Sequence, residues 1–155
     1  MHQLIQKQTL PIDPWEAWEF ISRPENLNQI TPPDLRFDIL STVPQVMYEG
    51  LLLLYEIRIP IVGKRKWVTE IKHIREGVSF VDEQRKGPYA FWYHYHEVKP
   101  DEAGTLMIDQ VYYQVPFGPL GLLANRVFVG PMLSKIFAYR YDKLQKLFGR
   151  VDPRS

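Results

Sequence analysis

Two histidines, His94 and His96, are separated by one residue in a segment that is rich in aromatic side chains. In an extended strand, residues two apart point to the same face, so both imidazoles can serve one site. Imidazole titrates near neutral pH, which suits acid–base chemistry, and it is also a common metal ligand. We expect His94 to meet Asp109 across the next hairpin, either as a catalytic base with its orienting carboxylate or as a hydrogen-bonded structural pair.

The sequence does not predict a metal site or another cofactor at this pair. The chain contains no Cys and no HExxH motif, and no obvious third ligand lies near His94 and His96 in the sequence. No residue is marked as a nucleophile, and the same polar set suits the recognition of a ligand. Catalysis by His94 and Asp109 is therefore kept as an alternative to ligand binding.

Asp82 and Arg140 are charged residues in otherwise apolar surroundings. Arg140 lies in the middle of the apolar stripe of the last predicted helix, where a guanidinium needs an acidic partner. Residues of the required kind are Asp82, Asp109 and Glu56. Of the roles open to Asp82 and Arg140, the sequence favours a buried structural pair over an active pair.

Turn signals define the elements that must position these residues. Residues 3–10 predict a strand, Asp13-Pro14 begins a short helix that ends before Pro24, and a second helical turn follows around 25–29. Short turns then separate six strand segments, at about 35–42, 50–59, 65–75, 78–85, 89–98 and 105–115. Beyond residue 119 a helical stripe contains Leu133, Ile136, Phe137, Arg140, Leu144, Leu147 and Phe148, with a kink or restart at Gly130-Pro131. This order predicts an α+β domain whose sheet is covered by the C-terminal helix.

The predicted hairpins divide the sheet into two faces. The turns pair Ile71 with Asp82, His73 with Phe80, Asp82 with Trp92, and His94 with Asp109. One face then mixes aromatic with charged side chains, as expected of a lined cavity, and it includes Trp67, Asp82, Trp92, His94, His96, Asp109 and Tyr113. The opposite face carries charges on two strands and, on the other two, an aromatic patch made of Phe91, Tyr93, Tyr95 and Tyr112. Such a patch indicates an interface, which predicts a homodimer.

Composition limits the classes of function. The 155 residues are 45% hydrophobic and 24% charged, which predicts one domain over 1–150 and a C-terminal tail over 151–155. A formal charge of +1 shows no basic excess, so nucleic acid is not an expected partner. The absence of Cys fits a reducing compartment, and the longest apolar run, 51–55, is far too short to span a bilayer. We expect a cytoplasmic protein without stable membrane insertion.

Several short stretches along the chain form a recognisable set in this order. They are Asn28-Gln29-Ile30-Thr31-Pro32-Pro33, Met47-Tyr48-Glu49-Gly50, residues 80–84, residues 87–96, Asp109-Gln110-Val111-Tyr112-Tyr113 and Ile136-Phe137-Ala138-Tyr139-Arg140. Together they resemble the START-like, or SRPBCC, superfamily, and the resemblance extends over nearly the whole chain. The chain looks most like the small bacterial ligand-binding or polyketide cyclase/dehydrase-like branch. The resemblance implies a helix-grip fold, in which a seven-stranded curved antiparallel sheet wraps around the long C-terminal helix with a mostly apolar cavity between them.

The resemblance also implies a class of ligand, because superfamily members bind lipids, sterols, polyketides, quinones or hormones, and some are cyclases or dehydratases. We therefore expect a small, largely apolar ligand of an aromatic, polyketide, quinone or lipid-like kind. The residues expected to contact it are Trp67, Asp82, Trp92, His94, His96, Asp109, Tyr113, Phe137 and Arg140. Two alternatives stay open: a cyclase or dehydratase that uses His94 with Asp109 as acid and base, and a protein-interaction module that uses the outer aromatic patch.

Overall fold

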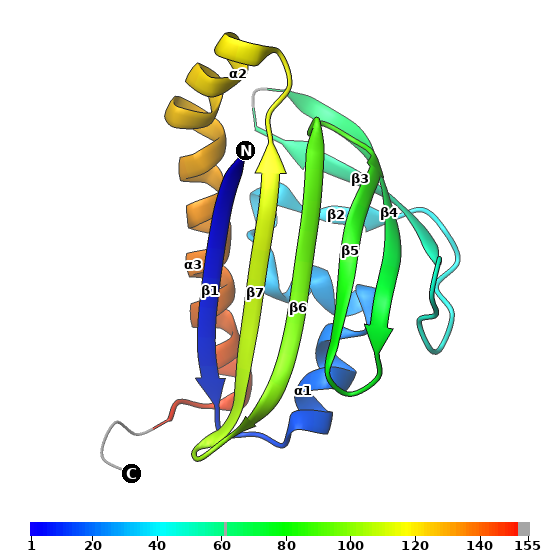
Figure 1. The fold of residues 1–155 in the computed structure, drawn as a ribbon, viewed down its shortest axis with the longest axis vertical. Coiled ribbons are helices and arrows are strands. Elements are labelled where there is room, and N and C mark those ends of the chain that lie inside the picture. Colours follow the sequence, from blue (N-terminus) through cyan, green and yellow to red (C-terminus); the bar gives the residue numbers. More distant parts are fainter. Residues whose placement is uncertain (61, 152–155) are drawn as a thin grey trace.

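The computed structural model describes residues 1–60 and 62–151, and its strands form one antiparallel sheet in the order β1-β7-β6-β5-β4-β3-β2 (Figure 1). The strands are β1 (His2–Leu10), β2 (Phe37–Ile39), β3 (Leu52–Ile59), β4 (Gly63–Arg75), β5 (Ser79–Lys86), β6 (Phe91–Asp101) and β7 (Gly104–Gln114). The first strand pairs with the last, so the six-stranded meander gains its seventh strand at the β7 edge. The seven-stranded antiparallel sheet expected from the sequence is confirmed.

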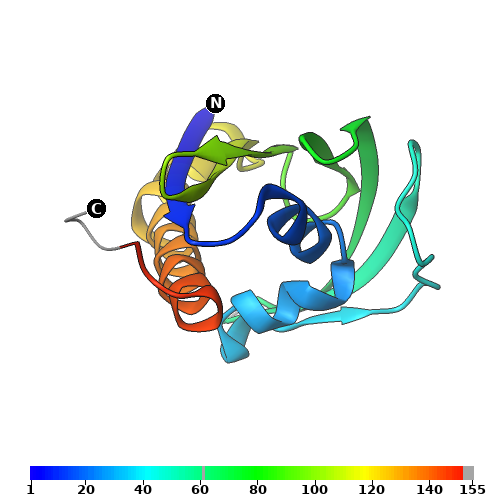
Figure 2. The same cartoon turned by 90° about the horizontal axis from the view of Figure 1, so that it is seen from below.

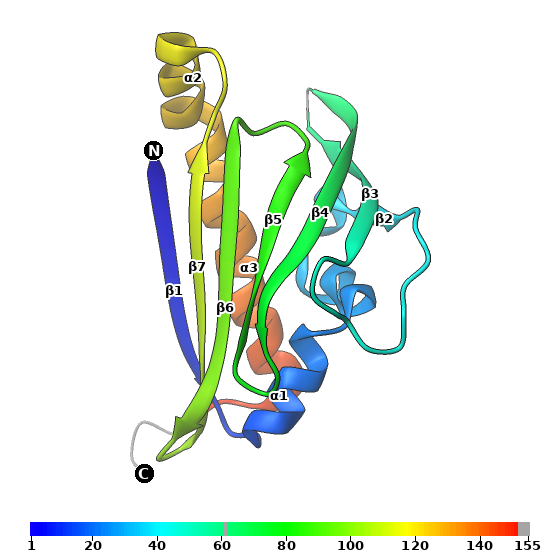
Figure 3. The same cartoon turned by 45° about the vertical axis from the view of Figure 1, so that its right-hand side comes forward.

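Helical segments lie on the concave side of this sheet. They are α1 (Pro14–Ile21), the 3₁₀ segments η1 (Pro24–Ile30) and η2 (Pro33–Leu35), then α2 (Gly118–Ala124), a π-helical turn η3 (Asn125–Val129) and α3 (Gly130–Phe148). Figure 2 shows the curved sheet from one end, with α3 on one side of it and α1 and η1 near its open side. In Figure 3, α3 runs lengthwise behind the strands. This is the helix-grip architecture expected from the sequence.

Local sequence explains where α1 begins. Asp13 accepts a hydrogen bond from the backbone N–H of Trp15 at 2.8 Å, and Pro14 occupies the first turn, where no backbone donor is lost. Trp18 is buried and packs edge-on against Phe80 of β5, with 5.8 Å between ring centroids. The predicted helix start is thus confirmed, and α1 is fixed to the sheet.

The register of two hairpins differs by two residues from the one expected. Asp82 lies opposite His94 rather than Trp92, and Asp109 lies opposite His96 rather than His94. Side chains alternate between the faces with a period of two, so a two-residue shift leaves each residue on its predicted face. The division of the sheet into a cavity face and an outer face therefore holds.

Longer strand pairing causes the shift. β6 and β7 pair as far as Asp101 and Gly104, with Pro100 opposite Thr105, whereas the sequence placed Pro100 in the turn. At the β5–β6 connection, the Gln84 side chain bonds the backbone of Tyr89 twice, at 2.8 Å to its carbonyl and 3.2 Å from its N–H. The loop closes further along the chain than Gly87, which the sequence took as its centre.

His73 does not lie opposite Phe80 on the cavity face, so that expectation was wrong. The pairing of β4 with β5 is irregular between Lys72 and Arg75, and His73 has a positive φ of 54°. The Glu49 carboxylate accepts hydrogen bonds from the backbone N–H groups of His73 and Ile74, at 2.9 and 3.1 Å, and this bonding lowers the pKa of Glu49. The resulting bulge turns the His73 side chain toward solvent.

The outer face of the sheet carries the expected mixture of ion pairs and aromatic rings. Lys72 pairs with Glu83 at 3.0 Å, and Arg85 pairs with Glu70. The aromatic patch lies on β6 and β7 and consists of Phe91, which is 37% exposed, and the half-buried Tyr93, Tyr95 and Tyr112. None of the described helical segments is placed over this face in Figure 1.

The C-terminal helical run, Gly118–Phe148, is long and apolar enough to cross a membrane by length and composition, and 22% of its most apolar window is buried. Leu133, Phe137, Arg140 and Leu144 of α3 are buried as predicted, whereas Leu147 is 43% exposed. The predicted restart at Gly130-Pro131 falls where the π-helical turn η3 ends. Of the predicted tail, residues 152–155 lie outside the described residues, and the domain boundary at residue 150 stays a prediction.

Candidate functional site

A pocket lies between α3, the 3₁₀ segment η1 and the concave face of the sheet, with a cavity volume of about 160 Å³. Most of its wall is apolar or aromatic. The sheet contributes Trp67 and Trp92, α3 contributes Leu133 and Phe137, and η1 contributes Leu27. Because aromatic side chains bury large apolar areas, such a wall favours an apolar body inside the pocket.

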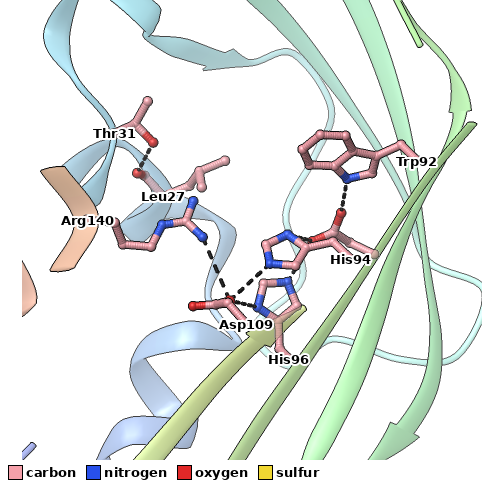
Figure 4. A network of polar contacts seen from close by, with 8 residues as sticks. Leu27, Thr31, Trp92, His94, His96, Asp109 and Arg140 are labelled. Atoms are coloured by element: carbon pink, nitrogen blue, oxygen red, sulfur yellow. Dashed lines mark hydrogen bonds and ion pairs between the residues drawn. The ribbon is translucent and has the colours of Figure 1, made fainter. Parts of the chain in front are cut away.

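One part of the wall is strongly polar. Asp82 comes from β5, His94 and His96 from β6, Asp109 from β7 and Arg140 from α3. The last four of these residues are labelled in Figure 4. The strand register explains the gathering, because Asp82 lies directly opposite His94, and His96 lies directly opposite Asp109. We call these five residues the polar cluster.

Each imidazole of the polar cluster bridges the same two carboxylates. His96 Nε2 lies 2.7 Å from Asp82 Oδ2, and its Nδ1 lies 2.9 Å from Asp109 Oδ1. His94 Nε2 lies 3.0 Å from Asp109 Oδ1, and its Nδ1 lies 3.3 Å from Asp82 Oδ2. The expected contact between His94 and Asp109 is therefore present, although the two residues are diagonal neighbours rather than a directly opposed pair.

Aromatic side chains hold this arrangement in place. The indole Nε1–H of Trp92 donates to Asp82 Oδ1 at 3.2 Å. Phe80 stacks on the His96 ring, with 4.4 Å between centroids and 18° between planes. Hydrogen bonds to the carboxylates and the stacking of Phe80 together restrict how the imidazoles can turn.

Arg140 pairs with Asp109 and not with Asp82, which corrects the pairing that the sequence favoured. Its Nη1 lies 3.8 Å from Asp109 Oδ1, and its buried Nε has no hydrogen-bond partner among the residues that the structure describes. The guanidinium also lies over the Phe137 ring, 5.0 Å from the centroid. Glu56, the third candidate partner, bonds Lys64 instead.

Burial and charge act in opposite directions on the pKa values of the cluster. Burial alone would raise the pKa of both carboxyl groups, yet His94 and His96 hold the pKa of Asp82 and of Asp109 below the ordinary range. Burial also opposes the charged form of His96, but its hydrogen bonds to Asp109 and Asp82 raise its pKa to about 9. At neutral pH, two carboxylates thus lie beside a protonated His96 and Arg140, so positive and negative charges balance.

Most of the predicted contact residues meet in this pocket. Its wall includes Trp67, Phe137 and Trp92 together with the whole polar cluster. Tyr113 is on the predicted face but does not line the pocket, because it lies further along β7, where it packs against Tyr89 and His2. The sheet is longer than the pocket, so a residue on the correct face can still lie outside it.

Sequence reasoning missed several residues of the pocket wall. Leu53, Tyr55 and Ile57 alternate along β3 and line the pocket. Their alternation is visible in the sequence and identifies them once the register is extended to that strand. Leu27 and Ile30 also line the pocket, but they belong to a 3₁₀ segment with no periodic signal that could indicate their direction.

No protein-family model matches the sequence, and no curated protein matches it significantly. Solved structures do match in shape. Protein CV1439 from Chromobacterium violaceum has a TM-score of 0.73 at 10% identity, with 96% of this chain and 99% of that chain covered. A START superfamily protein from Mycobacterium smegmatis has a TM-score of 0.70 at 13% identity, covering 95% and 99%.

A plant protein has the same architecture. Major latex-like protein 151 from Panax ginseng matches with a TM-score of 0.67 at 14% identity, covering 95% of this chain and 97% of that chain. The TM-scores establish a shared fold, whereas sequence identities this low carry no residue-level correspondence. Together with the sheet order and the long C-terminal helix, these matches show that the chain has the START-like helix-grip fold.

Proposed function

We propose that this protein binds a small, largely apolar ligand in the pocket between α3 and the sheet. The observation that carries the proposal is the composition of the wall, where apolar and aromatic side chains surround one compact polar cluster. Ligand sites commonly combine an apolar wall with a few converging polar groups that set orientation. The fold is also that of a START superfamily protein, which supports the same class of function.

Cavity size favours a compact ligand. A cavity of about 160 Å³ is close to the roughly 150 Å³ that accommodates a benzene molecule, and smaller than the roughly 300–1,000 Å³ of sites for drug-sized ligands. A single-ring aromatic compound therefore fits with little rearrangement. A polyketide, quinone or lipid of larger size requires α3 or η1 to move outward.

The Nε–H group of Arg140 favours a ligand that carries an oxygen acceptor. This Nε–H is buried, has no hydrogen-bond partner within residues 1–60 and 62–151, and belongs to a side chain that lines the pocket. Leaving a buried donor unpaired costs about 1–3 kcal/mol. A ligand carbonyl, phenol or carboxylate oxygen at this end removes that cost, so phenolic or keto-substituted rings are the preferred class.

Native mass spectrometry with a panel of phenols, aryl ketones and quinones tests the proposal. Met132→Trp fills the pocket from α3, and Val127→Trp is the control, because Val127 is 69% exposed and does not line the pocket. We expect one compact ligand per chain in the parent protein, about tenfold weaker binding in Met132→Trp, and unchanged binding in Val127→Trp. Failure of the parent protein to bind any panel member or any copurified compound contradicts the proposal.

A second candidate function is catalysis of the cyclase or dehydratase type. It is favoured by the position of His94 in the pocket wall, with its Nε2 held 3.0 Å from Asp109 Oδ1. In this case His94→Gln abolishes turnover of a bound substrate while ligand affinity and folding are retained. Unchanged turnover in that variant rules out the assignment.

The expected cytoplasmic location, the lack of stable membrane insertion and the lack of a nucleic-acid partner stay predictions.

A further inference from the structure

The two imidazoles of the polar cluster share one carboxylate oxygen. His94 Nε2 and His96 Nδ1 both approach Asp109 Oδ1, at 3.0 and 2.9 Å. With a proton on each of these nitrogens, both rings donate to Asp109. One carboxylate then sets the tautomer and the direction of two imidazoles at once.

The remaining nitrogens then present lone pairs to a common point. His94 Nδ1 and His96 Nε2 both face Asp82 Oδ2, at 3.3 and 2.7 Å. Two lone pairs and a carboxylate oxygen repel one another unless positive charge lies between them. That charge is supplied either by protons on the imidazoles or by a metal ion.

Without a metal, the proton on His96 joins its Nε2 to Asp82 Oδ2, and His94 Nδ1 faces the same oxygen with a lone pair. A metal ion that displaces this proton contacts all three atoms. One proton joins one nitrogen to one oxygen, and protonating both rings places two imidazolium ions with only 3.7 Å between their centroids. The three ligand atoms all lie within 4.8 Å of one another. A first-row ion holds nitrogen and oxygen ligands at about 2.0–2.2 Å, so small side-chain adjustments complete the coordination.

Neighbouring groups support a site on the Asp82 side of the cluster. Trp92 Nε1–H donates to Asp82 Oδ1 at 3.2 Å, so Oδ2 is the oxygen that faces both imidazoles, at 2.7 Å from His96 Nε2 and 3.3 Å from His94 Nδ1. Asp109 orients both imidazoles, as carboxylates commonly do for metal-bound histidines. Arg140 already places positive charge beside Asp109, so a further cation is favoured at Asp82.

We propose that Asp82 Oδ2, His94 Nδ1 and His96 Nε2 form a binding site for a divalent transition-metal ion of the Zn²⁺ or Fe²⁺ kind. Two imidazoles and one carboxylate are a donor set that suits these ions and leaves coordination positions open. All three residues line the pocket, so the open positions face its interior. The sequence discounted a metal for want of a third ligand, and the fold supplies Asp82 from the neighbouring strand.

This site does not depend on the proposed ligand, because it is formed by the protein alone. The test uses the full chain after treatment with a chelator, followed by titration with Zn²⁺ in a calorimeter and with Co²⁺ by visible absorption. We expect one ion per chain and Co²⁺ absorption bands of a four- or five-coordinate site. His96→Gln lowers the affinity by more than about 100-fold, since it removes one of three ligands and even the loss of an outer partner of a ligand costs roughly 10–100-fold.

His73→Gln is the matched control, because His73 is exposed on the β4 bulge and lies outside the pocket wall. It retains the parent affinity, and His94→Gln with a native circular dichroism spectrum repeats the loss seen for His96→Gln. Absence of stoichiometric binding in the parent protein, or equal binding in the parent and His96→Gln proteins, overturns the proposal. Ligand binding is measured separately on metal-free protein, so failure of one claim does not conceal failure of the other.

Discussion

Asp109 is the residue on which the polar cluster depends most. Its Oδ1 contacts both imidazoles and faces the guanidinium of Arg140, and the residue is only 8% exposed. Removing its charge leaves Arg140 without its acidic partner in a buried site. Buried charges are stable only when each has a partner of opposite charge. The loss of one partner leaves the remaining groups desolvated and unpaired.

Asp109→Asn is therefore expected to lower the free energy of unfolding by about 3–5 kcal/mol, the usual cost of breaking a buried charge pair. Urea denaturation followed by tryptophan fluorescence measures the change. Asp38→Asn is the control, because Asp38 is 50% exposed in its pair with Arg36, and it changes stability by about 0.5 kcal/mol or less. A loss below about 1 kcal/mol for Asp109→Asn contradicts the described charge network.

Tyr55, a residue of the pocket wall, makes the stability of the protein depend on pH in the alkaline range. Burial, followed by the charges of Asp82 and Glu25, raises the pKa of its phenol well above the ordinary value. In the unfolded chain the phenol ionises near pH 10, while in the folded chain it stays neutral to higher pH. The free energy of unfolding is thus unaffected by this group below pH 10 and falls as the pH rises above it.

We expect Tyr55→Phe to reduce the stability loss between pH 9 and pH 11, because phenylalanine cannot ionise. Thermal melts across this range provide the measurement. Tyr48→Phe is the control, since Tyr48 is 57% exposed, and it leaves the pH dependence as in the parent protein. Identical pH profiles for the Tyr55→Phe and parent proteins refute the assignment.

At the scale of elements, the sequence predicts local features better than distant ones. Asp13 and Pro14 define the start of α1 through contacts within a few residues, and period-two alternation assigns faces even where the register is shifted by two. The bulge at His73 was not predictable, because Glu49 holds it from twenty-four residues away in the chain. Asp109 was among the acidic partners that the sequence offered for Arg140, but the choice of Asp82 was wrong, since the sequence does not show where α3 lies over the strands.

The β6–β7 turn offers a test of how closely that turn approaches the end of β1. Gly104 has a φ of 134°, and a Cβ there comes within 2.3 Å of the Leu10 carbonyl oxygen of β1. We expect Gly104→Ala to destabilise the protein by more than 2 kcal/mol, because strain is added to a clash with backbone. Gly50→Ala shares a positive φ but has open space around it, and it costs about 1 kcal/mol. Equal costs in chemical denaturation contradict the close approach of the turn to β1.

At the scale of the whole molecule, the outer aromatic patch remains without a described partner. We propose that Phe91, Tyr93, Tyr95 and Tyr112 form a homodimer interface, since they lie together on β6 and β7 on the face opposite the pocket. Aromatic side chains are enriched at such interfaces. In this arrangement each chain keeps its own pocket, so dimerisation and ligand binding are independent.

Sedimentation velocity tests this arrangement. The parent protein is expected to sediment as a dimer at micromolar concentrations, and Tyr93→Lys as a monomer, because a buried lysine without a partner opposes association. Tyr48→Lys is the control, because it makes the same substitution at a 57% exposed tyrosine outside the patch, and it is expected to remain a dimer. A parent protein that stays monomeric at high concentration removes the case for the interface.

The central claim is that the pocket holds a compact, largely apolar ligand whose oxygen bonds Arg140. Its most direct test is a crystal structure of the protein grown with the tightest-binding phenol or aryl ketone from the panel. The account predicts difference density for one ring among Trp67, Trp92 and Phe137, with an oxygen at hydrogen-bond distance from Arg140 Nε. A pocket filled only by side chains or ordered water under these conditions contradicts it.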